Sequence, residues 1–388
     1  MQDFNYLDEN AVYLDAACQS LRPQPVIDAL EDYYHHFNSC GDRVKYKWGE
    51  TLDSKVADTR AKVLKYLKLS GKKYFVSFTL NTTYGLNLLL NQINSQKIKQ
   101  IFTSDIEHNS VFLSSMALSQ NHKLKRTVMS REDDGSIAVG DYDFDHALVI
   151  VNVFCNFDGR RLLNLKELVK TVHKAGGIII VDAAQGMVHA RSLLQKTEAD
   201  AICFSAHKMY APSLGVMVVR RDLLPRIKTD FIGGGMVDDV RETDFDLSAE
   251  KNPDHAHTIF EPGLQAWGEI VAFGAAIDWL EHLPKDIFAK TQSQAQKLYD
   301  FLASRPKVHL LNTEPSSILS FYVEDVNSHL IAAALGDEGI MARSGYFCAH
   351  YYLDHVKHYP DLLRLSLGLH NRDSDIDKVI EALNKVTA

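Results

Sequence analysis

Polar residues that follow two apolar stretches carry the most chemical information in this sequence. Lys208 ends the segment AICFSAHK (201–208), in which a short apolar run leads into a turn. Asp182 and Gln185 stand at the same place after the apolar run of GGIIIVDAAQ (176–185). Both runs have strand character, and the ligands of open α/β sheets bind at the carboxyl ends of the strands. We therefore expect the aspartate and the lysine to face one ligand site.

A carboxylate and an amine at this edge of a sheet suit the cofactor pyridoxal 5′-phosphate. Its aldehyde forms a Schiff base with a lysine, and its ring nitrogen needs an acidic partner to stay protonated and withdraw electrons. Each residue alone has a simpler explanation, because a lysine after a strand is usually solvated and an aspartate there often caps the next helix. Their occurrence together, with Ser205, His207 and Gln185 nearby, favours the cofactor site.

The segment NTTYGLNLLL (81–90) could bind the phosphate of such a cofactor. Phosphates bind to backbone N–H groups and hydroxyls at a helix N-terminus, and Thr82 and Thr83 stand where a helix is expected to begin. Ser205 and His207, just before the lysine, would add to this site. Thr82 could equally be a simple helix cap, because capping and phosphate binding use the same geometry. On this motif alone both interpretations remain open.

Motifs along nearly the whole chain resemble those of one enzyme family. The family's motifs and their counterparts here are YLDNAATS for YLDAACQSLRP (Tyr13–Pro23), FTxGTTExIN for FTLNTTYGLNLL (Phe78–Leu89), EHHSN for IEHNS (Ile106–Ser110) and VSNxxG for FCNFDG (Phe154–Gly159). VDAAQ, FSAHKMYAP, FIGGGM, FEPG, ARSGYFCAH and LLRLSLGLHN follow in the family's order. Together they resemble the fold-type I pyridoxal-phosphate enzymes of aminotransferase class V, within them the cysteine desulfurase and selenocysteine lyase group.

The resemblance implies roles for several residues around the cofactor. His108 would stack on the pyridine ring and move protons. The alternative is that it is simply a packed or surface residue, as a single histidine among the 17 of this chain more often is. Asn156 and Gln185 would hydrogen-bond the 3′-oxygen of the ring. Asp182 would hold the pyridinium proton, because a neighbouring negative charge favours the protonated ring.

The resemblance also implies a substrate site and a nucleophile. Arg364 would bind the substrate carboxylate with its planar fork, assisted by Arg343 and Asn156. Cys348, in RSGYFCAH, matches the family cysteine that accepts sulfur. A free cysteine is commonly a small buried hydrophobe, an explanation that suits Cys203 inside its strand. A thiolate is the nucleophile that sulfur transfer needs, and nearby cations favour it.

The chain departs from the family pattern at several positions. DRVKY (Asp42–Tyr46) keeps Arg43 of the family's HRGxH but loses both histidines, and Tyr346 and Phe347 replace the two histidines of RxGHHCA. Leu264 stands where the FEAGTP loop has a threonine that reaches the partner subunit's phosphate. Asn81 replaces a glycine, which asparagine can do because it also enters left-handed conformations.

Alternating apolar and amphipathic segments must position these residues. Runs of strand character, most of them apolar on both faces as a covered parallel sheet requires, are KYFVSF, KQIFTSD, ALVIVNVF, GGIIIVD, AICFS and GVMVVR. Helical spacing in Lys55–Leu69 and in NLKELVKTVHKAG gives the β–α–β rhythm of an α/β fold. A long helix is expected at Leu264–Leu283, followed by a strand in Ser316–Val323 and two short helices.

The resemblance implies an α/β fold, that of fold-type I pyridoxal-phosphate-dependent transferases. We expect a large domain with a mainly parallel seven-stranded sheet and a small α+β C-terminal domain. The large cofactor-binding domain is placed at residues 15–262. The small domain, with an interdomain helix, is placed at residues 1–14 and 263–388.

Composition excludes several other classes of protein. The 388 residues are 46% hydrophobic and 24% charged with a net charge of −8, which disfavours nucleic-acid binding. Five cysteines without metal-type spacing are typical of a reducing compartment, and no metal site is expected. The N-terminal residues do not resemble a signal peptide, and no apolar run approaches the roughly 20 residues of a membrane helix. We therefore expect a cytoplasmic protein without membrane partners.

These observations predict a pyridoxal-phosphate-dependent cysteine desulfurase. It would convert L-cysteine to L-alanine, leave the sulfur on Cys348 as a persulfide, act as a homodimer and pass the sulfur to an acceptor protein. Another class V reaction on an amino acid, by a C–S lyase, an epimerase or an aminotransferase, is the nearest alternative, and it needs no cysteine at position 348. A binding protein that has lost catalysis is disfavoured by Lys208, Asp182 and Arg364. A Rossmann protein is disfavoured because no G-x-G-x-x-G follows the early strands.

Overall fold

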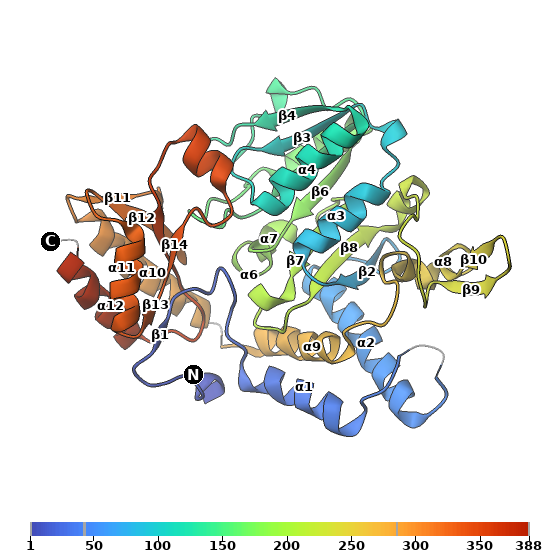
Figure 1. Ribbon diagram of the computed structural model, residues 1–388, viewed down its shortest axis with the longest axis horizontal. Coiled ribbons are helices and arrows are strands. Elements are labelled where there is room, and N and C mark those ends of the chain that lie inside the picture. The colour runs from blue at the N-terminus through green and yellow to red at the C-terminus, as the bar shows by residue number, and fades with distance from the viewer. Residues whose placement is uncertain (1, 42–43, 285, 387–388) are drawn as a thin grey trace.

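The computed structural model of the protein describes residues 2–41, 44–284 and 286–386. At its centre lies a sheet of seven strands. The strand order is β2-β8-β7-β6-β5-β3-β4 (Figure 1). Neighbouring strands are parallel except in the two pairs made by β8. The predicted mainly parallel seven-stranded sheet is confirmed. Its strands are β2 (Tyr74–Thr79), β3 (Gln100–Ser104), β4 (Lys125–Met129), β5 (Ala147–Asn152), β6 (Ile178–Asp182), β7 (Ala201–Ser205) and β8 (Gly215–Arg220).

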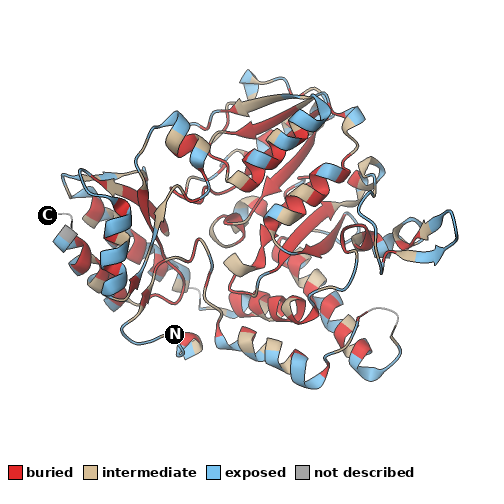
Figure 2. Cartoon of the chain, viewed as in Figure 1, coloured by how far each residue is buried: buried red, intermediate tan, exposed pale blue. Residues whose placement is uncertain are grey.

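Apolar residues on both faces of these strands explain why the sheet lies inside the molecule. Every residue of β2, β5, β6 and β7 is buried (Figure 2). In β6, Ile178 and Ile180 pack in one cluster with helices α3 (Thr82–Gln92) and α4 (Asn109–His122). Ile179 and Val181 point to the opposite face, as the two-residue period of a strand requires. That face is covered by α2 (Lys47–Tyr66), α5 (Leu165–Lys174) and α9 (Trp267–His282).

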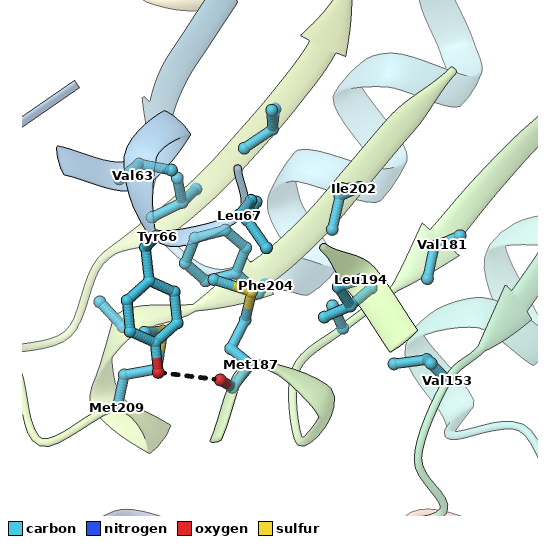
Figure 3. Close-up of a cluster of buried hydrophobic side chains, with 14 of the residues drawn as sticks. Val63, Tyr66, Leu67, Val153, Val181, Met187, Leu194, Ile202, Phe204 and Met209 are labelled. Atoms are coloured by element: carbon cyan, nitrogen blue, oxygen red, sulfur yellow. Dashed lines mark hydrogen bonds between the residues drawn. The ribbon is translucent and has the colours of Figure 1, made fainter. Parts of the chain in front are cut away.

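One part of this core supports the segments that follow β6 and β7 (Figure 3). Val63, Tyr66 and Leu67 at the end of α2 pack with Phe204 of β7 and with Met187. The Tyr66 hydroxyl donates a hydrogen bond of 3.2 Å to the Met187 carbonyl. Met209, which directly follows Lys208, belongs to the same cluster. The turns after both strands are thereby anchored to the core of the large sheet.

The C-terminal part of the chain forms a second sheet with its own core (Figure 1). Its antiparallel strands, in the order β11-β12-β15-β14, are Val308–Leu310, Ile318–Val323, Leu362–Ser366 and Arg343–Gly345. Helices α10 (Ile287–Ala303), α11 (Ser328–Asp337) and α12 (Asp373–Val386) accompany it. Strand β1 (Val12–Tyr13) pairs in parallel with β13 (Ile340–Met341), so the N-terminal residues Val12 and Leu14 share this core. Helix α9 was predicted to belong with the small domain as the interdomain helix, but it packs in the core of the large sheet. The domain limits at residues 14/15 and 262/263 therefore remain a prediction.

The remaining elements complete the two parts. They are α1 (Gln24–His36), α6 (Gly186–His189), α7 (Arg191–Leu194), α8 (Ser248–Lys251) and the hairpin of β9 (Val237–Val240) and β10 (Phe245–Leu247), which projects at the right of Figure 1. Among the described residues no helix is both long and apolar enough to cross a membrane.

The sequence-based predictions of four elements differ from the structure. Helix α2 starts at Lys47, before the predicted Lys55, and the predicted helix Leu264–Leu283 is shortened to α9. Strand β4 was not predicted because it is an edge strand whose residues are mostly polar and only partly buried. Helix α10 was not predicted because its buried face includes Thr291 and Gln294, which hide the apolar period.

Candidate active site

A cleft of about 270 Å³ lies where the large sheet meets the second sheet. Polar segments that follow β5, β6 and β7 form one wall, and β14, β15 and the loop after β14 contribute another. The structure brings together in this cleft every residue that the sequence analysis selected, namely Thr82, Thr83, His108, Asn156, Asp182, Gln185, Ser205, His207, Lys208, Arg343, Cys348 and Arg364.

One end of the cleft is built from the start of α3 and the end of β7. The Thr82 N–H donates to the Ser205 hydroxyl oxygen at 2.9 Å, and the two hydroxyl oxygens lie 2.6 Å apart. The helix cap is Asn81, whose side chain accepts from the Tyr84 N–H at 2.9 Å, so Thr82 is not the cap. Asn81 has an extended backbone, φ −170°, and the expectation that it uses a left-handed conformation was wrong. The hydroxyls of Thr82 and Thr83 are therefore free of the capping role that could have explained them.

His207 adds a polar group at the same end of the cleft. Its ring lines the cleft, and its Nδ1 is buried without a hydrogen-bond partner among the described residues. Burial, with the positive charges of Lys208 and Arg22, lowers the pKa of His207 to about 4. The ring is neutral at pH 7, and its open nitrogen fits a ligand rather than a packing role.

Asp182 and Lys208 form the centre of the site. Asp182 is the last residue of β6, is 4% exposed, and accepts a hydrogen bond of 2.8 Å from the Ala184 N–H. Burial raises the pKa of Asp182, while the Ala184 N–H and the charge of Lys208 oppose this change. Burial lowers the pKa of the Lys208 amine, and the negative charge of Asp182 opposes it. The two groups thus stabilise each other's charge in a cleft that otherwise favours their neutral forms.

His108 caps α4 and lies beside these two groups in the cleft. Its Nδ1 accepts a hydrogen bond of 3.0 Å from the Ser110 N–H, which assigns the ring proton to Nε2. Burial lowers the pKa of His108 to about 3, and Lys208 and Arg364 add to the shift. The imidazole is therefore neutral at pH 7, and its orientation is fixed by the start of the helix.

Two amide side chains tie the cleft to more distant segments. Gln185 Nε2 donates to the Ala17 carbonyl at 2.5 Å, and Asn156 Nδ2 donates to the Phe347 carbonyl at 2.8 Å. Among the described residues neither side-chain oxygen has a hydrogen-bond donor, so both oxygens are available to other partners. Each amide therefore joins a segment of the large sheet to the N-terminal or C-terminal part of the chain.

The two arginines share one carboxylate. Arg343 on β14 and Arg364 on β15 stand directly opposite each other. Asp15 accepts from Arg343 Nη2 at 2.7 Å and from Arg364 Nη2 at 3.1 Å. Arg364 Nη1 also donates to the Asn156 carbonyl at 2.9 Å, while its buried Nε has no partner among the described residues. Asp15 thus holds together two like charges that would otherwise repel across the strands.

The loop that carries Cys348 is fixed at the cysteine itself and at the two residues before it. The Asn109 N–H at the start of α4 donates to the Cys348 carbonyl at 2.6 Å, and the Arg364 guanidinium lies 4.7 Å above the Phe347 ring. Phe347 and Cys348 both have positive φ, 49° and 59°. The Tyr346 hydroxyl donates to the Tyr359 carbonyl at 3.1 Å. The two aromatic residues that replace the family's histidines therefore serve packing, and Cys348 remains exposed at the cleft.

Other positions at which the sequence departs from the family can be placed only in part. Leu264 is 76% exposed in the loop before α9. Asp42 and Arg43 lie outside the residues that the structure describes.

Sequence reasoning assigned no role to Asp15 and Cys18, which also belong to the site. Asp15 pairs with arginines 328 and 349 positions away, and such distances leave no local pattern. Cys18 lines the same cleft. The available signal was the YLDAACQ segment, which the resemblance identified as a unit without showing which of its side chains reach the cleft.

Comparisons with known proteins agree with this geometry. Residues 12–379 match the family described as aminotransferase class-V. A probable cysteine desulfurase of Pseudomonas aeruginosa is 30% identical over 97% of this chain and 94% of its own length. One from Halalkalibacterium halodurans is 28% identical, over 96% and 92% of the two chains. The crystal structure of the cysteine desulfurase CsdA from Escherichia coli superposes with a TM-score of 0.87 at 24% identity, covering 99% of this chain and 96% of that one, which shows a shared fold.

Proposed function

The chain belongs to the aminotransferase class-V family, and we propose that it is a pyridoxal-phosphate-dependent cysteine desulfurase that converts L-cysteine to L-alanine. The predicted family and fold are confirmed by the comparisons. The observation that carries the proposal is one cleft that holds a lysine, a buried aspartate, two arginines and an accessible cysteine.

The donor set of the cleft fits pyridoxal phosphate. Thr82, Thr83, Ser205 and His207 surround the N-terminus of α3, where a phosphate is favoured by backbone N–H groups and the helix dipole. The unpartnered Nδ1 of His207 supports a ligand at this end. Asp182 would hold the pyridine nitrogen, with His108 against the ring. When bound, the cofactor supplies an electron sink for the negative charge that forms at the Cα atom of an amino acid.

Lys208 is the group proposed to bind the cofactor's aldehyde and to move the substrate proton. Burial lowers the pKa of its amine, which favours the neutral form that can take a proton from Cα. The 3₁₀ turn 206–208 and its neighbour Met209 are anchored in the core, which restricts the position of the amine. His108, neutral and with its proton on Nε2, would orient the ring rather than serve as the main acid.

The arginines are proposed to bind the substrate carboxylate. Arg364 is 3% exposed and lines the cleft, and its Nε–H is the buried donor that lacks a partner. An anion beside it would satisfy this donor with the geometry that guanidinium groups favour. Asp15 accepts a hydrogen bond from Arg364 Nη2, and Arg343 adds positive charge at the edge of the cleft.

Cys348 is proposed to take the sulfur. Its thiolate attacks the sulfur of the substrate, the Cβ–S bond breaks with its electron pair going to Cβ, and Cβ then takes a proton. The products are alanine and a persulfide on Cys348. The exposure of Cys348 supports a later transfer of this sulfur to a separate acceptor protein, and the five free cysteines are consistent with a reducing cytoplasm.

A homodimer is proposed from exposed apolar residues on two adjoining loops. Phe231, Ile232 and Leu264 are all exposed, and the Gly263 N–H joins the two loops by donating to the Gly234 carbonyl at 2.7 Å. A second copy that covers this surface would form a symmetric dimer. Sedimentation should show a dimer, and Leu264→Asp should weaken it. A monomer with full activity at every concentration would contradict this part of the proposal.

The function is tested by incubating the protein with L-cysteine and a thiol while alanine and sulfide are measured together. The wild type should release both in equal amounts. Cys348→Ala should lose alanine release by about three orders of magnitude or more, as expected for an essential nucleophile. Cys40→Ala is the matched control, because this exposed cysteine does not line the cleft.

Two further observations separate loss of chemistry from loss of structure. Cys348→Ala should keep the yellow absorption band of the lysine-bound cofactor, which borohydride bleaches, and Lys208→Ala should lack it. If Cys348→Ala released alanine at the wild-type rate, the protein would catalyse another class V reaction, and the cysteine would only pack against its loop.

A further inference from the structure

A second cysteine, Cys18, lines the same cleft. Cys18 and Cys348 both line it, whereas Cys155 and Cys203 are fully buried in the core and Cys40 is exposed elsewhere. The proposed reaction uses only Cys348. Cys18 is thus a nucleophilic side chain in the active cleft for which the reaction gives no role.

The backbone around Cys18 is held from three directions. Its own N–H donates to the Asp15 carbonyl at 3.0 Å, and the Ser20 N–H donates to the His207 carbonyl at 2.9 Å. Gln185 donates to the Ala17 carbonyl at 2.5 Å on the other side. The turn is therefore fixed directly to the segment that carries Lys208. The position of the Cys18 thiol relative to the amine is set by the fold and not by a free loop.

The sulfur of Cys18 also has a cationic partner. Arg343 Nη2 donates to Cys18 Sγ at 2.9 Å, while the same guanidinium is held by Asp15. A positive N–H donor at this distance compensates negative charge on the sulfur. A negative charge on either Cys18 or Cys348 would raise the pKa of Lys208, which shows that both thiols lie within electrostatic reach of the same amine.

We propose that Cys18 is a second sulfur carrier that accepts the outer sulfur from the Cys348 persulfide. This inference rests on the proposed desulfurase function. The Cys18 thiolate attacks the outer sulfur of Cys348, a new bond forms between that sulfur and Cys18 Sγ, and the bond to Cys348 Sγ breaks. Cys348 leaves as a thiolate, stays available for the next cysteine, and the proton remains on the transferred sulfur. The exchange is balanced without any oxidant or reductant.

The two thiols differ in their exposure to solvent. Cys348 is exposed, whereas Cys18 is only partly exposed and accepts a hydrogen bond from Arg343. Sulfur moved to Cys18 is thus shielded from solvent nucleophiles while Cys348 accepts another sulfur. Each chain can store two sulfur atoms before an acceptor arrives.

The test uses the cofactor-loaded protein, L-cysteine and no added thiol. Alanine is measured in the first burst, and the protein is then quenched, alkylated and cleaved after glutamate for mass spectrometry. Glu9 and Glu31 flank Cys18 and separate it from Cys40, which cleavage by trypsin would not do because Pro23 follows Arg22. The wild type should release about two alanines per chain, and persulfide should be found on both Cys18 and Cys348.

Variants make each outcome decisive. Cys18→Ser should halve the burst to about one alanine per chain and keep the persulfide on Cys348, and Cys40→Ser should behave as the wild type. Cys348→Ser should leave Cys18 unmodified. Persulfide on Cys18 in the Cys348→Ser protein, or a wild-type burst of one with Cys348 alone loaded, would overturn the transfer. Absence of both alanine and persulfide from the wild type would instead refute the desulfurase function itself.

Discussion

Removing the charge of Asp15 should separate the energetic contributions of the two arginines that share it. The Asp15 side chain is 16% exposed, and its partners differ sharply, since Arg364 is 3% exposed and Arg343 is 44% exposed. In Asp15→Asn the buried Arg364 loses its counter-charge and faces Arg343 directly across the antiparallel strands. We expect this variant to lower the free energy of unfolding by about 3 kcal/mol, the scale for breaking a buried ion pair from one side.

The two pairs should couple unequally in double-mutant cycles. The coupling of Asp15→Asn with Arg364→Met should be about 2 kcal/mol, because that hydrogen bond to a charged group is buried. The coupling with Arg343→Met should be about 0.5 kcal/mol, because water screens the exposed pair. In the Asp15→Asn background Arg343→Met should cost nothing, since it then removes a like charge from beside Arg364.

Urea unfolding of the apoprotein, with all variants at one pH and ionic strength, measures these differences. Raising the salt concentration should reduce the Arg343 coupling and leave the Arg364 coupling nearly unchanged, because buried pairs are screened less. Equal couplings for the two arginines, or a stronger coupling for Arg343, would refute the conclusion that Asp15 mainly neutralises the buried arginine.

Three further predictions concern the supports of the site. Burial raises the pKa of Glu107 from 4.5 to about 7, so the folded protein binds the proton more tightly than the unfolded chain. Relative to Glu107→Gln, the free energy of unfolding of the wild type should therefore fall by about 2.5 kcal/mol as pH rises from 5 to 8, measured by urea titration at both pH values. Gly215→Ala would place a Cβ 2.2 Å from the Thr79 hydroxyl and 2.6 Å from the Asn81 backbone. It should therefore weaken cofactor binding about tenfold or more in a spectral titration, whereas the control Gly140→Ala, which has open space around its Cβ, should leave binding unchanged. Phe204→Ala should lower the free energy of unfolding by about 3–5 kcal/mol because it leaves a cavity under the Lys208 turn, and unchanged stability would contradict the packing seen there.

The sequence predicted most of the large sheet because its strands are apolar on both faces and end in polar residues. Asp182 and Lys208 could be identified in this way, since Asp182 ends one apolar run and Lys208 ends the short turn that follows another. Strand β4 and helix α10 could not, because partly buried polar residues disturb their periods.

The part of the site that the sequence did not predict depends on long-range contacts. The carboxylate of Asp15 gains its role in the site only through the fold, because β14 and β15 place Arg343 and Arg364 within hydrogen-bonding distance of it. The thiol of Cys18 likewise acquires a partner only through Arg343. A single sequence carries no local signal for contacts between its first twenty residues and its last strands. Family motifs can identify such a segment as part of the site, but they do not show which residues it contacts.

The parallel pairing of the N-terminal segment with the C-terminal part of the chain has a consequence for synthesis on the ribosome. The Ala17 N–H donates to the Ser366 hydroxyl at 3.0 Å, and Leu14 accepts from the Ser366 N–H, so the turn that carries Asp15 and Cys18 cannot take its place until β15 has been made. The large sheet, which is complete at Arg220, can assemble long before that. A nascent chain therefore passes through a stage in which Lys208 is in position while the two arginines, Cys348 and the turn that carries Asp15 and Cys18 are not. Active-site assembly is one of the last events in making the protein, so a chain that is released early has no working site with which to generate reactive sulfur.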